Sequence, residues 1–416
     1  MDHLLVTVGG SSAPIVRTLR TLRARHVIFF CSSGPRGSVT QVQGDGLVCE
    51  DVNRQLSLRN IPTQAELPAG TFDVCLIKDP DQLQECYRAA LHAIRDLQAE
   101  HPHSRIAVDY SGGTKSMSAG LLTAAIEAGL SDIYMVTGVR RDLRQVTDGT
   151  ELVQKVNLQV VFHHRAAAHA NDLASRWDYA GAERILTSMS VQGAGLDDSI
   201  TRAVAACRAF DAWDRFEYRD ALHLLKQTRG FDDHKGCLGR LAQTTDIGSP
   251  TRAAACLHVA DLISNAGRRA DRGRYDDAVA RIYRAIEQIA QARLLFRHDI
   301  NTEAVSRSAL TEELDARHPG KGPATLGLLS AWELLLAREA DSRIGRHYAE
   351  HRDRLVDGLK IRNLSCLAHG STPVSARQFH EMMESGMGRF AWECAEFLLE
   401  EERLPRIPEW PRALLS

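Results

Sequence analysis

The sequence predicts an α/β domain built on a parallel sheet, followed by an all-helical region. In the first part, short runs of β-branched and aromatic residues alternate with helical patterns, which is typical of a parallel sheet covered on both faces. From about residue 165, Ala, Leu, Arg and Glu recur at helical spacing and β-branched runs become rare. We therefore expect three parts, an α/β domain at 1–164, a helical spacer at 165–250 and a second helical domain at 251–416.

The α/β domain contains five strand-like runs and a closing hairpin or pair of edge strands. The strands are expected at Leu4–Val8, Val27–Cys31, Phe72–Ile77, Arg105–Val108 and Ile133–Thr137, and the closing segments at Leu143–Thr147 and Val153–Phe162. In open parallel sheets, ligands bind in the crevice beyond the carboxyl ends of the strands. The loops that follow the strands are therefore the places to look for a binding site.

One of these loops, residues 109–116, forms a strand-loop-helix corner. Its adjacent Gly112 and Gly113 let a ligand approach the backbone, the helix start offers unpaired N–H groups, and Lys115 adds a positive charge. These features suit a phosphate or the edge of a nucleotide. Because Thr114 and not glycine precedes Lys115, the corner is not a Walker A loop, and a magnesium-dependent NTPase is disfavoured.

Two further loops rich in glycine and hydroxyl groups are expected to converge on the same crevice. The first follows the first strand, and Ser12 there is expected to cap a helix with Pro14 in its first turn. The predicted ligand-binding residues are Gly9, Gly10, Ser11, Ser12, Ser32, Ser33, Ser111, Gly112, Gly113, Thr114 and Lys115. The alternative is that these residues only form tight turns. The first loop lacks a complete Gly-x-Gly-x-x-Gly pattern, which argues against a standard dinucleotide fold.

The helical region begins with segments in which an aromatic residue is followed shortly by alanine. Such segments lie at 177–182, 216–221 and 273–278, and they are typical of helix pairs in tetratricopeptide-like stacks. Their spacing is not constant, so we interpret them as packed helix pairs and not as a true repeat. The glycines and the proline within 228–250 mark the expected internal boundary.

The last domain contains an arginine-histidine pattern that suits catalysis. Arg362 and His369 are seven residues apart, which places them two turns apart on one face of a predicted helix. Arginine keeps its charge and histidine titrates near neutrality, so the pair can neutralise a phosphate and move protons without a metal, as cleavage of RNA by its own 2′-hydroxyl requires. The alternative is an ordinary amphipathic helix with an arginine and a histidine near its end.

One such site has difficulty in supplying both a base for the 2′-hydroxyl and an acid for the leaving 5′-oxygen. Two copies that face each other across a two-fold axis supply both. A composite site in a homodimer is therefore the hypothesis that the chemistry favours.

Both halves of the chain resemble known domains. The N-terminal half resembles the CARF domain (CRISPR-associated Rossmann fold), through Val8-Gly9-Gly10-Ser11-Ser12 and through Asp109-Tyr110-Ser111-Gly112-Gly113-Thr114-Lys115. The C-terminal half looks like a HEPN ribonuclease domain, whose motif is Arg, four to six residues, then His; here six residues, the first of them Asn363, separate Arg362 from His369. Together, in this order, they are similar to the ancillary ribonucleases of type III CRISPR systems.

The resemblance implies a homodimer that binds a cyclic oligoadenylate through paired CARF domains. Binding would activate the paired HEPN domains to cut single-stranded RNA without a metal, giving a 2′,3′-cyclic phosphate, in antiviral defence. It implies catalytic roles for Arg362, Asn363 and His369, and ligand roles for Ser11, Ser12 and residues 112–115. Two alternatives stay open, a protein that mainly binds or degrades the messenger (a ring nuclease) and a sensor-linked regulator without ribonuclease activity.

The composition points to a cytoplasmic protein, and we expect no cofactor besides the activating messenger. Lys and Arg total 51 against 53 for Asp and Glu, which gives no general reason to expect binding to duplex DNA or a membrane surface. Nine cysteines without a Cys-x-x-Cys pair fit free thiols in a reducing compartment, and neither a signal peptide nor a membrane span is evident. His347 and His351, with Asp353 nearby, suit zinc but lack an obvious third ligand, so no metal site is predicted.

Overall fold

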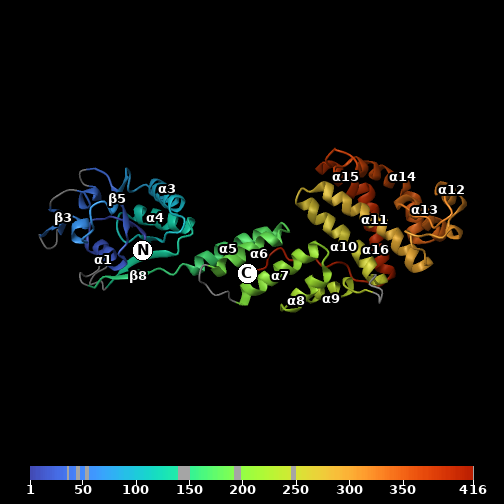
Figure 1. Ribbon diagram of the computed structural model, residues 1–416, viewed down its shortest axis with the longest axis horizontal. Coiled ribbons are helices and arrows are strands. Elements are labelled where there is room, and N and C mark those ends of the chain that lie inside the picture. Colours follow the sequence, from blue (N-terminus) through green and yellow to red (C-terminus); the bar gives the residue numbers. More distant parts are fainter. Residues whose placement is uncertain are drawn as a thin grey trace. The chain divides into compact units, whose positions relative to one another are not determined.

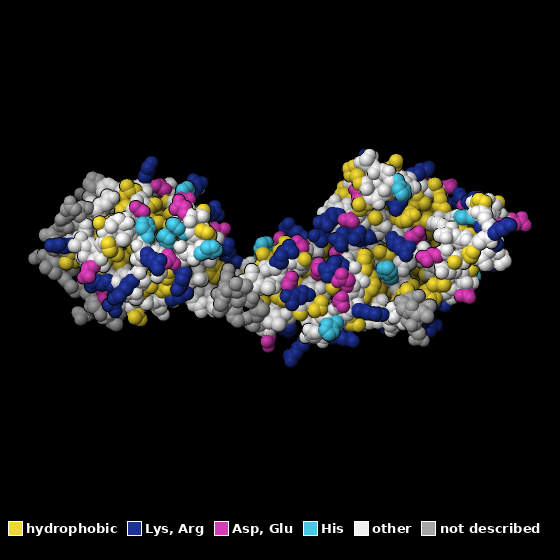
Figure 2. Space-filling model, viewed as in Figure 1, with side chains coloured by type: hydrophobic (Ala, Val, Ile, Leu, Met, Phe, Trp, Pro, Cys, Tyr) yellow, Lys and Arg dark blue, Asp and Glu magenta, His cyan; other side chains and the backbone are white. Residues whose placement is uncertain are grey.

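The computed structural model describes residues 1–34, 37–43, 47–51, 56–138, 150–191, 198–244 and 250–415 (Figure 1). The chain divides into two compact units, Met1–Val161 and Phe162–Ser416. On the face shown in Figure 2, Lys and Arg side chains are interspersed with Asp and Glu. None of the described helices has the length and apolar character of a segment that crosses a bilayer.

The first unit contains a six-stranded sheet in the order β5-β2-β1-β6-β7-β8. The strands are β1 (His3–Thr7), β2 (His26–Ser32), β5 (Phe72–Ile77), β6 (Ile106–Asp109), β7 (Asp132–Thr137) and β8 (Leu152–Lys155). The first five pair in parallel, and β8 is antiparallel to β7. The predicted parallel sheet is therefore confirmed, together with its five strands.

The end of the first unit differs from the expectation. The predicted strand at 153–162 is too long, because β8 ends at Lys155 and helix α5 (Gln159–Ser175) begins four residues later. The other expected closing segment, 143–147, lies outside the described residues. A short antiparallel pair, β3 (Leu47–Asp51) and β4 (Leu56–Arg59), was not anticipated.

Helices cover both faces of the sheet. The helices of this unit are α1 (Ala13–Leu22), α2 (Ile61–Gln64), α3 (Leu83–Glu100) and α4 (Lys115–Glu127). Because side chains alternate along a strand, Leu5 of β1 packs in the core under α3 and α4, whereas Leu4 and Val6 pack in the core under α1. Figure 1 shows α3 and α4 together, away from α1.

The order of the strands fixes where a ligand can bind. From β1 the chain moves outward through β2 to β5, and it then returns to the opposite side of β1 to form β6. The connections that leave β1 and β6 therefore diverge, which opens a crevice at the carboxyl ends of these two neighbouring strands. The loops at 8–12 and 110–114 border this crevice.

The second unit is helical in its described parts, as the sequence predicts. Its further helices are α6 (Tyr179–Val191), α7 (Asp198–Asp214), α8 (Tyr218–Lys226), α9 (Asp232–Leu241), α10 (Arg252–Asp271), α11 (Tyr275–His298), α12 (Glu312–Arg317), α13 (Leu328–Glu339), α14 (Arg343–Leu364), α15 (Ala376–Ser385) and α16 (Met387–Glu401). The three aromatic-alanine segments lie at the turns α5–α6, α7–α8 and α10–α11, where φ is positive at Trp177, Phe216 and Gly273. They are helix pairs, as we interpreted them.

The C-terminal residues return to the spacer helices. Two cores lie in this unit, one mainly among α5–α9 and one among α10–α16, and Trp410 belongs to the first. The Tyr179 hydroxyl donates to the carbonyl of Pro411 at 2.7 Å, and Asn171 Oδ1 accepts from the N–H of Leu414 at 2.8 Å. Residues 404–415 thus complete the core of α5–α9, a contact that no pattern in the sequence predicts.

Replacing Trp410 with alanine tests this return. Trp410 is only 5% exposed, packs 5.2 Å from both Phe210 and Trp213, and carries the Arg268 guanidinium 3.6 Å above its ring. Because the cavity left by a buried tryptophan costs about 3–5 kcal/mol, we expect a clear fall in the unfolding midpoint by calorimetry. Trp392, which is 43% exposed, is the matched control, and an equally small effect for both variants would contradict the packing.

Candidate functional site

The loops after β1 and β6 touch through glycine backbone. A Cβ on Gly9 would lie 2.5 Å from the backbone nitrogen of Gly113, and a Cβ on Gly112 would lie 2.2 Å from the carbonyl oxygen of Thr7. The Thr7 hydroxyl also donates to the Gly112 carbonyl at 2.7 Å. Glycine is required at these positions because no side chain fits between the two strands' loops. The structure therefore brings two of the three predicted loops together.

The start of α4 presents a free cation beside this contact. Gly113 has a φ of +80°, and Thr114 caps α4 by accepting from the N–H of Met117 at 3.2 Å. The Thr114 hydroxyl in turn donates to the carbonyl of Pro80, so it is engaged on both sides. Lys115 is exposed, and its ammonium has no hydrogen bond or ion pair with any residue that the structure describes. A negatively charged ligand can therefore reach it.

The Ser111 side chain forms hydrogen bonds within the sheet and is not free to bind a ligand in the crevice. Asp109 is fully buried, and it accepts hydrogen bonds from the Thr18 hydroxyl, the Ser111 hydroxyl and the Ser111 N–H, the last at 2.8 Å. The Ser111 hydroxyl also accepts from the N–H of Val136 at 2.6 Å. Burial raises the pKa of the Asp109 carboxyl, while these three donors oppose the rise. The Ser111 hydroxyl is thus committed to holding β6 and β7 in place.

Some of the remaining predicted ligand-binding residues hold their own loops, and others are exposed. Ser12 occupies the position before α1 and Pro14 lies in the first turn, as expected, but the expected cap is wrong because the buried Ser12 hydroxyl accepts no backbone hydrogen bond of the helix. The Ser32 hydroxyl accepts from the N–H of Ser38 at 2.8 Å, which closes its own loop. Gly10, Ser11 and Ser33 are exposed.

The arginine-histidine motif does not lie on one helical face. Helix α14 ends at Leu364, so the prediction of two residues two turns apart on the same helix is wrong. The chain turns back instead, and the His369 N–H donates to the carbonyl of Asn363 at 3.3 Å. A Cβ on Gly370 would lie 2.0 Å from the carbonyl oxygen of Leu364, so this tight turn requires glycine. The backbone of His369 therefore lies beside the helix end that carries Arg362.

Arg362 is half-buried and held in place by its neighbours. Its guanidinium lies 4.1 Å from the centre of the Tyr283 ring, and Nη1 donates to Asn363 Oδ1 at 3.1 Å. Burial raises the pKa of the Tyr283 hydroxyl, which therefore stays neutral beneath the cation. Arg362 Nε is buried and has no hydrogen-bond partner among the described residues. The side chain is fixed, yet one of its donors is unused.

Asp276 holds both ends of the loop that carries His369. Its Oδ1 accepts from the N–H of Cys366 at 3.2 Å, and its Oδ2 accepts from the N–H of Val374 at 3.0 Å. Asp276 lies in the first turn of α11, the helix that also supplies Tyr283. Sequence reasoning missed this role, because an acidic residue in a first turn is common for its interaction with the helix dipole alone.

Two leucines beside the motif face solvent. Leu364 is 64% exposed and Leu367 is 55% exposed, and the side chains of Asn363 and His369 are exposed with them. Apolar side chains grouped next to charged ones in this way are typical of surfaces that bind another macromolecule.

Replacing Asp276 with alanine should release the loop. Loss of both carboxylate oxygens leaves the Cys366 and Val374 amides without their acceptor, at a cost of about 1–3 kcal/mol each. We expect hydrogen exchange at these two amides to accelerate by about tenfold or more. The control is Asp220→Ala, which removes a first-turn carboxylate from α8 that accepts no hydrogen bond among the described residues. Unchanged exchange in Asp276→Ala would contradict the assignment.

The chain is similar to known proteins in part of its sequence and in its fold. Residues 251–388 match the family model of the Csm6 HEPN domain, and no curated protein matches the sequence. The chain is similar to Enterococcus italicus Csm6 bound to cyclic hexa-2′-fluoro-hexa-dAMP, with a TM-score of 0.61 at 12% identity over 96% of this chain and 95% of that chain. The likeness to Can2 from Sulfobacillus thermosulfidooxidans in complex with cyclic tetra-adenylate is slight, with a TM-score of 0.24 at 10% identity over 55% of this chain and 69% of that chain.

The family match spans the loop and the motif described above, and the structural likeness covers both units of the chain. At 12% identity the likeness establishes the fold. Residues 251–388 therefore match the Csm6 HEPN domain family, and the chain as a whole has the Csm6 fold, in agreement with its resemblance to the CARF-HEPN proteins of type III CRISPR systems.

Proposed function

We propose that the protein is a metal-independent endoribonuclease, activated by a cyclic oligoadenylate, that cuts single-stranded RNA in the cytoplasm during type III CRISPR antiviral defence. The observation that carries the proposal is the grouping of Arg362, Asn363 and His369 at one helix end within the Csm6 HEPN match. The crevice between β1 and β6 in the same chain supports a sensor for an anionic ligand. In this proposal the chain consists of a CARF unit at 1–164, a spacer at 165–250 and a HEPN domain at 251–416.

The crevice is the proposed binding site of the messenger. E. italicus Csm6 was determined with a cyclic hexanucleotide analogue bound, and we extend this class of ligand to the present chain. Phosphates or ribose edges would meet the backbone N–H groups at Gly112 and Gly113, and Lys115 would supply the charge. Gly10, Ser11 and Ser33 are exposed and can contribute further contacts, whereas the hydroxyls of Ser32 and Ser111 act through the loops that they hold.

The catalytic site is proposed to form between two copies of the chain. A single His369 cannot act as base and acid in the same step, whereas two related by a two-fold axis can. The exposed Leu364 and Leu367 support a partner at this surface. Burial of the two leucines would contribute to the dimer interface.

In the proposed reaction, His369 of one protomer accepts the proton of the 2′-hydroxyl, whose oxygen attacks the adjacent phosphorus. The bond from phosphorus to the 5′-oxygen breaks, and the second His369 donates a proton to that oxygen. Arg362 stabilises the negative charge that grows on the phosphoryl oxygens, and Asn363 orients Arg362 through the hydrogen bond from Nη1. The products are a 2′,3′-cyclic phosphate and a 5′-hydroxyl. Activation requires that the messenger bind the active arrangement of the dimer more tightly than the resting one.

Replacing His369 with alanine separates cleavage from sensing. Because general acid-base catalysis contributes about 10²–10⁴-fold, we expect the rate of RNA cleavage in EDTA to fall by at least about 100-fold. Binding of cyclic tetra- and hexa-adenylate, measured by calorimetry, should not change. His380→Ala removes an exposed histidine from α15 and is the matched control. Cleavage retained by His369→Ala would remove the basis of the proposed function.

Replacing Lys115 with alanine tests the crevice. Hydrogen bonds to charged groups contribute about 1.5–3 kcal/mol, so the messenger concentration for half-maximal activation should rise by roughly tenfold or more, with the maximal rate unchanged. Arg95 on α3 is exposed and has no partner among the described residues, which makes Arg95→Ala a control of equal charge change. An activation curve identical to that of the unmodified protein would place the messenger elsewhere.

A further inference from the structure

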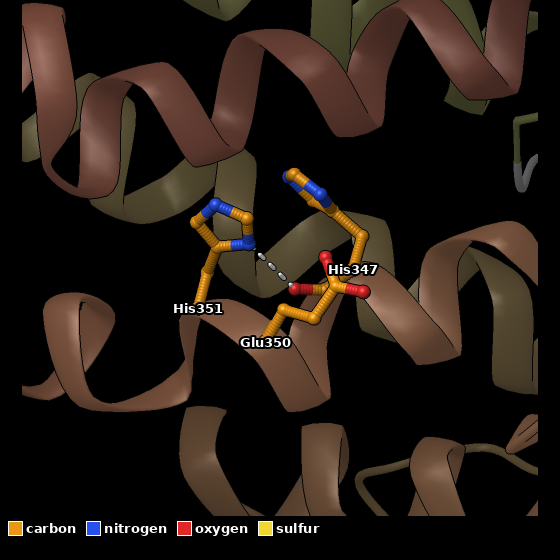
Figure 3. A group of neighbouring side chains, drawn as sticks. All are labelled: His347, Glu350 and His351. Atoms are coloured by element: carbon orange, nitrogen blue, oxygen red, sulfur yellow. Dashed lines mark hydrogen bonds between the residues drawn. The ribbon is translucent and has the colours of Figure 1, made fainter.

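A cluster of metal-ligating side chains lies on α14, away from its catalytic end. His347, Glu350 and His351 each offer one ligand atom, and these atoms lie within 4.8 Å of one another. Figure 3 shows the three side chains leaving the same stretch of the helix on one side. Residues three and four positions apart share a helix face, so this spacing brings the three groups together without any contribution from loops.

The hydrogen bond at His351 leaves Nε2 available to an ion, but Nδ1 is the ring nitrogen that faces Glu350 in Figure 3, so a rotation of the ring must bring Nε2 toward the other ligands. His351 Nδ1 lies 3.0 Å from the carbonyl oxygen of His347 (Figure 3). A carbonyl can only accept, so Nδ1 is the donor, and in the neutral ring the lone pair is on Nε2. Metal-binding histidines are oriented by a hydrogen bond from the other ring nitrogen in just this way.

His347 has a buried nitrogen for which the fold provides no hydrogen bond. Its Nε2 lies 3.2 Å from Glu393 Oε2 on α16, but the direction is not that of a hydrogen bond, and no described residue is a hydrogen-bond partner of this buried atom. Two ligands of a tetrahedral zinc ion, each about 2.0–2.1 Å from the metal, lie roughly 3.3 Å apart. The separation of the nitrogen and the carboxylate oxygen therefore suits two ligands of one ion.

The charges around the cluster also suit a dication. Glu350 has no ion pair among the described residues, and Glu393 meets Arg389 through Oε1, at 2.6 Å, which leaves Oε2 for another partner. Nearby Arg343 pairs with Glu400. Two neutral imidazoles and two carboxylates give the nitrogen and oxygen donors, and the balancing charge, that zinc prefers. We propose that His347, Glu350 and His351 of α14 bind one divalent transition-metal ion, zinc above all, and that Glu393 of α16, which lies beside His347 Nε2, rotates to become the fourth ligand.

The proposed ion joins α14 to α16 and takes no part in the cleavage of RNA. His351 and Arg362 are eleven residues apart, which corresponds to about 16 Å along the helix. The ion therefore stabilises the helix that carries Arg362 without touching the reacting phosphate. Sequence reasoning found the histidine pair, with Asp353 nearby, but no obvious third ligand. The structure supplies Glu350, and it places Glu393 of α16 beside His347.

Metal titration of the full-length, untagged and chelator-treated chain tests the site. With Co²⁺ as the probe, we expect a visible d–d absorption band from nitrogen and oxygen ligands at one ion per chain. In competition with Zn²⁺, His351→Ala and Glu350→Gln should each weaken binding by at least about tenfold. His380→Ala removes a histidine whose Nδ1 also bonds to the carbonyl four residues before it, and it should bind the ion as the unmodified protein does.

A thermal measurement gives a second readout. Because an ion that binds only the folded state stabilises it, Zn²⁺ should raise the unfolding midpoint of the unmodified protein and of His380→Ala, but not that of His351→Ala. The proposal is overturned if the unmodified protein takes up no Co²⁺ or Zn²⁺, or if His351→Ala binds the ion as tightly as His380→Ala. Neither measurement involves RNA or the messenger, so the result is independent of the proposed function.

Discussion

The hydrogen bonds at the first turn of α11 connect the loop that carries His369 to the helices around it. Asp276 fixes both ends of the loop that carries His369, and its neighbour Asp277 accepts from Arg281 Nη1 at 3.2 Å. Arg281 Nε donates to Asn265 Oδ1 at 2.6 Å, and Asn265 Nδ2 donates to Asp214 Oδ1 at 3.0 Å. Asp214 lies at the end of α7, in the spacer. Hydrogen bonds therefore run from the spacer to the turn that positions the loop carrying His369.

These polar groups are costly to separate because they are buried. Asp261 is fully buried and accepts from Trp213 Nε1 at 3.1 Å and from the Tyr218 hydroxyl at 3.0 Å, and burial raises its pKa. Arg268 Nη2 lies 3.6 Å from Asp261 Oδ1, and removing one partner of a buried ion pair typically costs about 3–5 kcal/mol, since the other charge remains without solvent. The spacer is thus firmly joined to α10, and a shift of one relative to the other must break several such contacts at once.

Much of the architecture follows from patterns that are local in the sequence. Short runs of β-branched and aromatic residues that alternate with helical patterns, and the change to helical spacing near residue 165, are enough to predict the parallel sheet and the helical half. The glycine corner was predictable because adjacent glycines before a lysine have a direct physical use. What the sequence hides is non-local. The closure of Gly370 onto Leu364, which ends α14 early, and the pairing of Asp276 with residues 90 and 98 positions away depend on contacts that no spacing rule encodes.

The return of residues 404–415 to the spacer has a consequence for synthesis. The ribosome makes α5–α9 first, but Trp410 leaves the exit tunnel only after α10–α16 have been translated. Until then, Phe210 and Trp213 lack the ring that covers them, so the earliest helices of this unit are the last to be sealed. The helices that are translated first in this unit therefore have the core that is completed last. A nascent chain that stalls after α16 would present an apolar surface to chaperones.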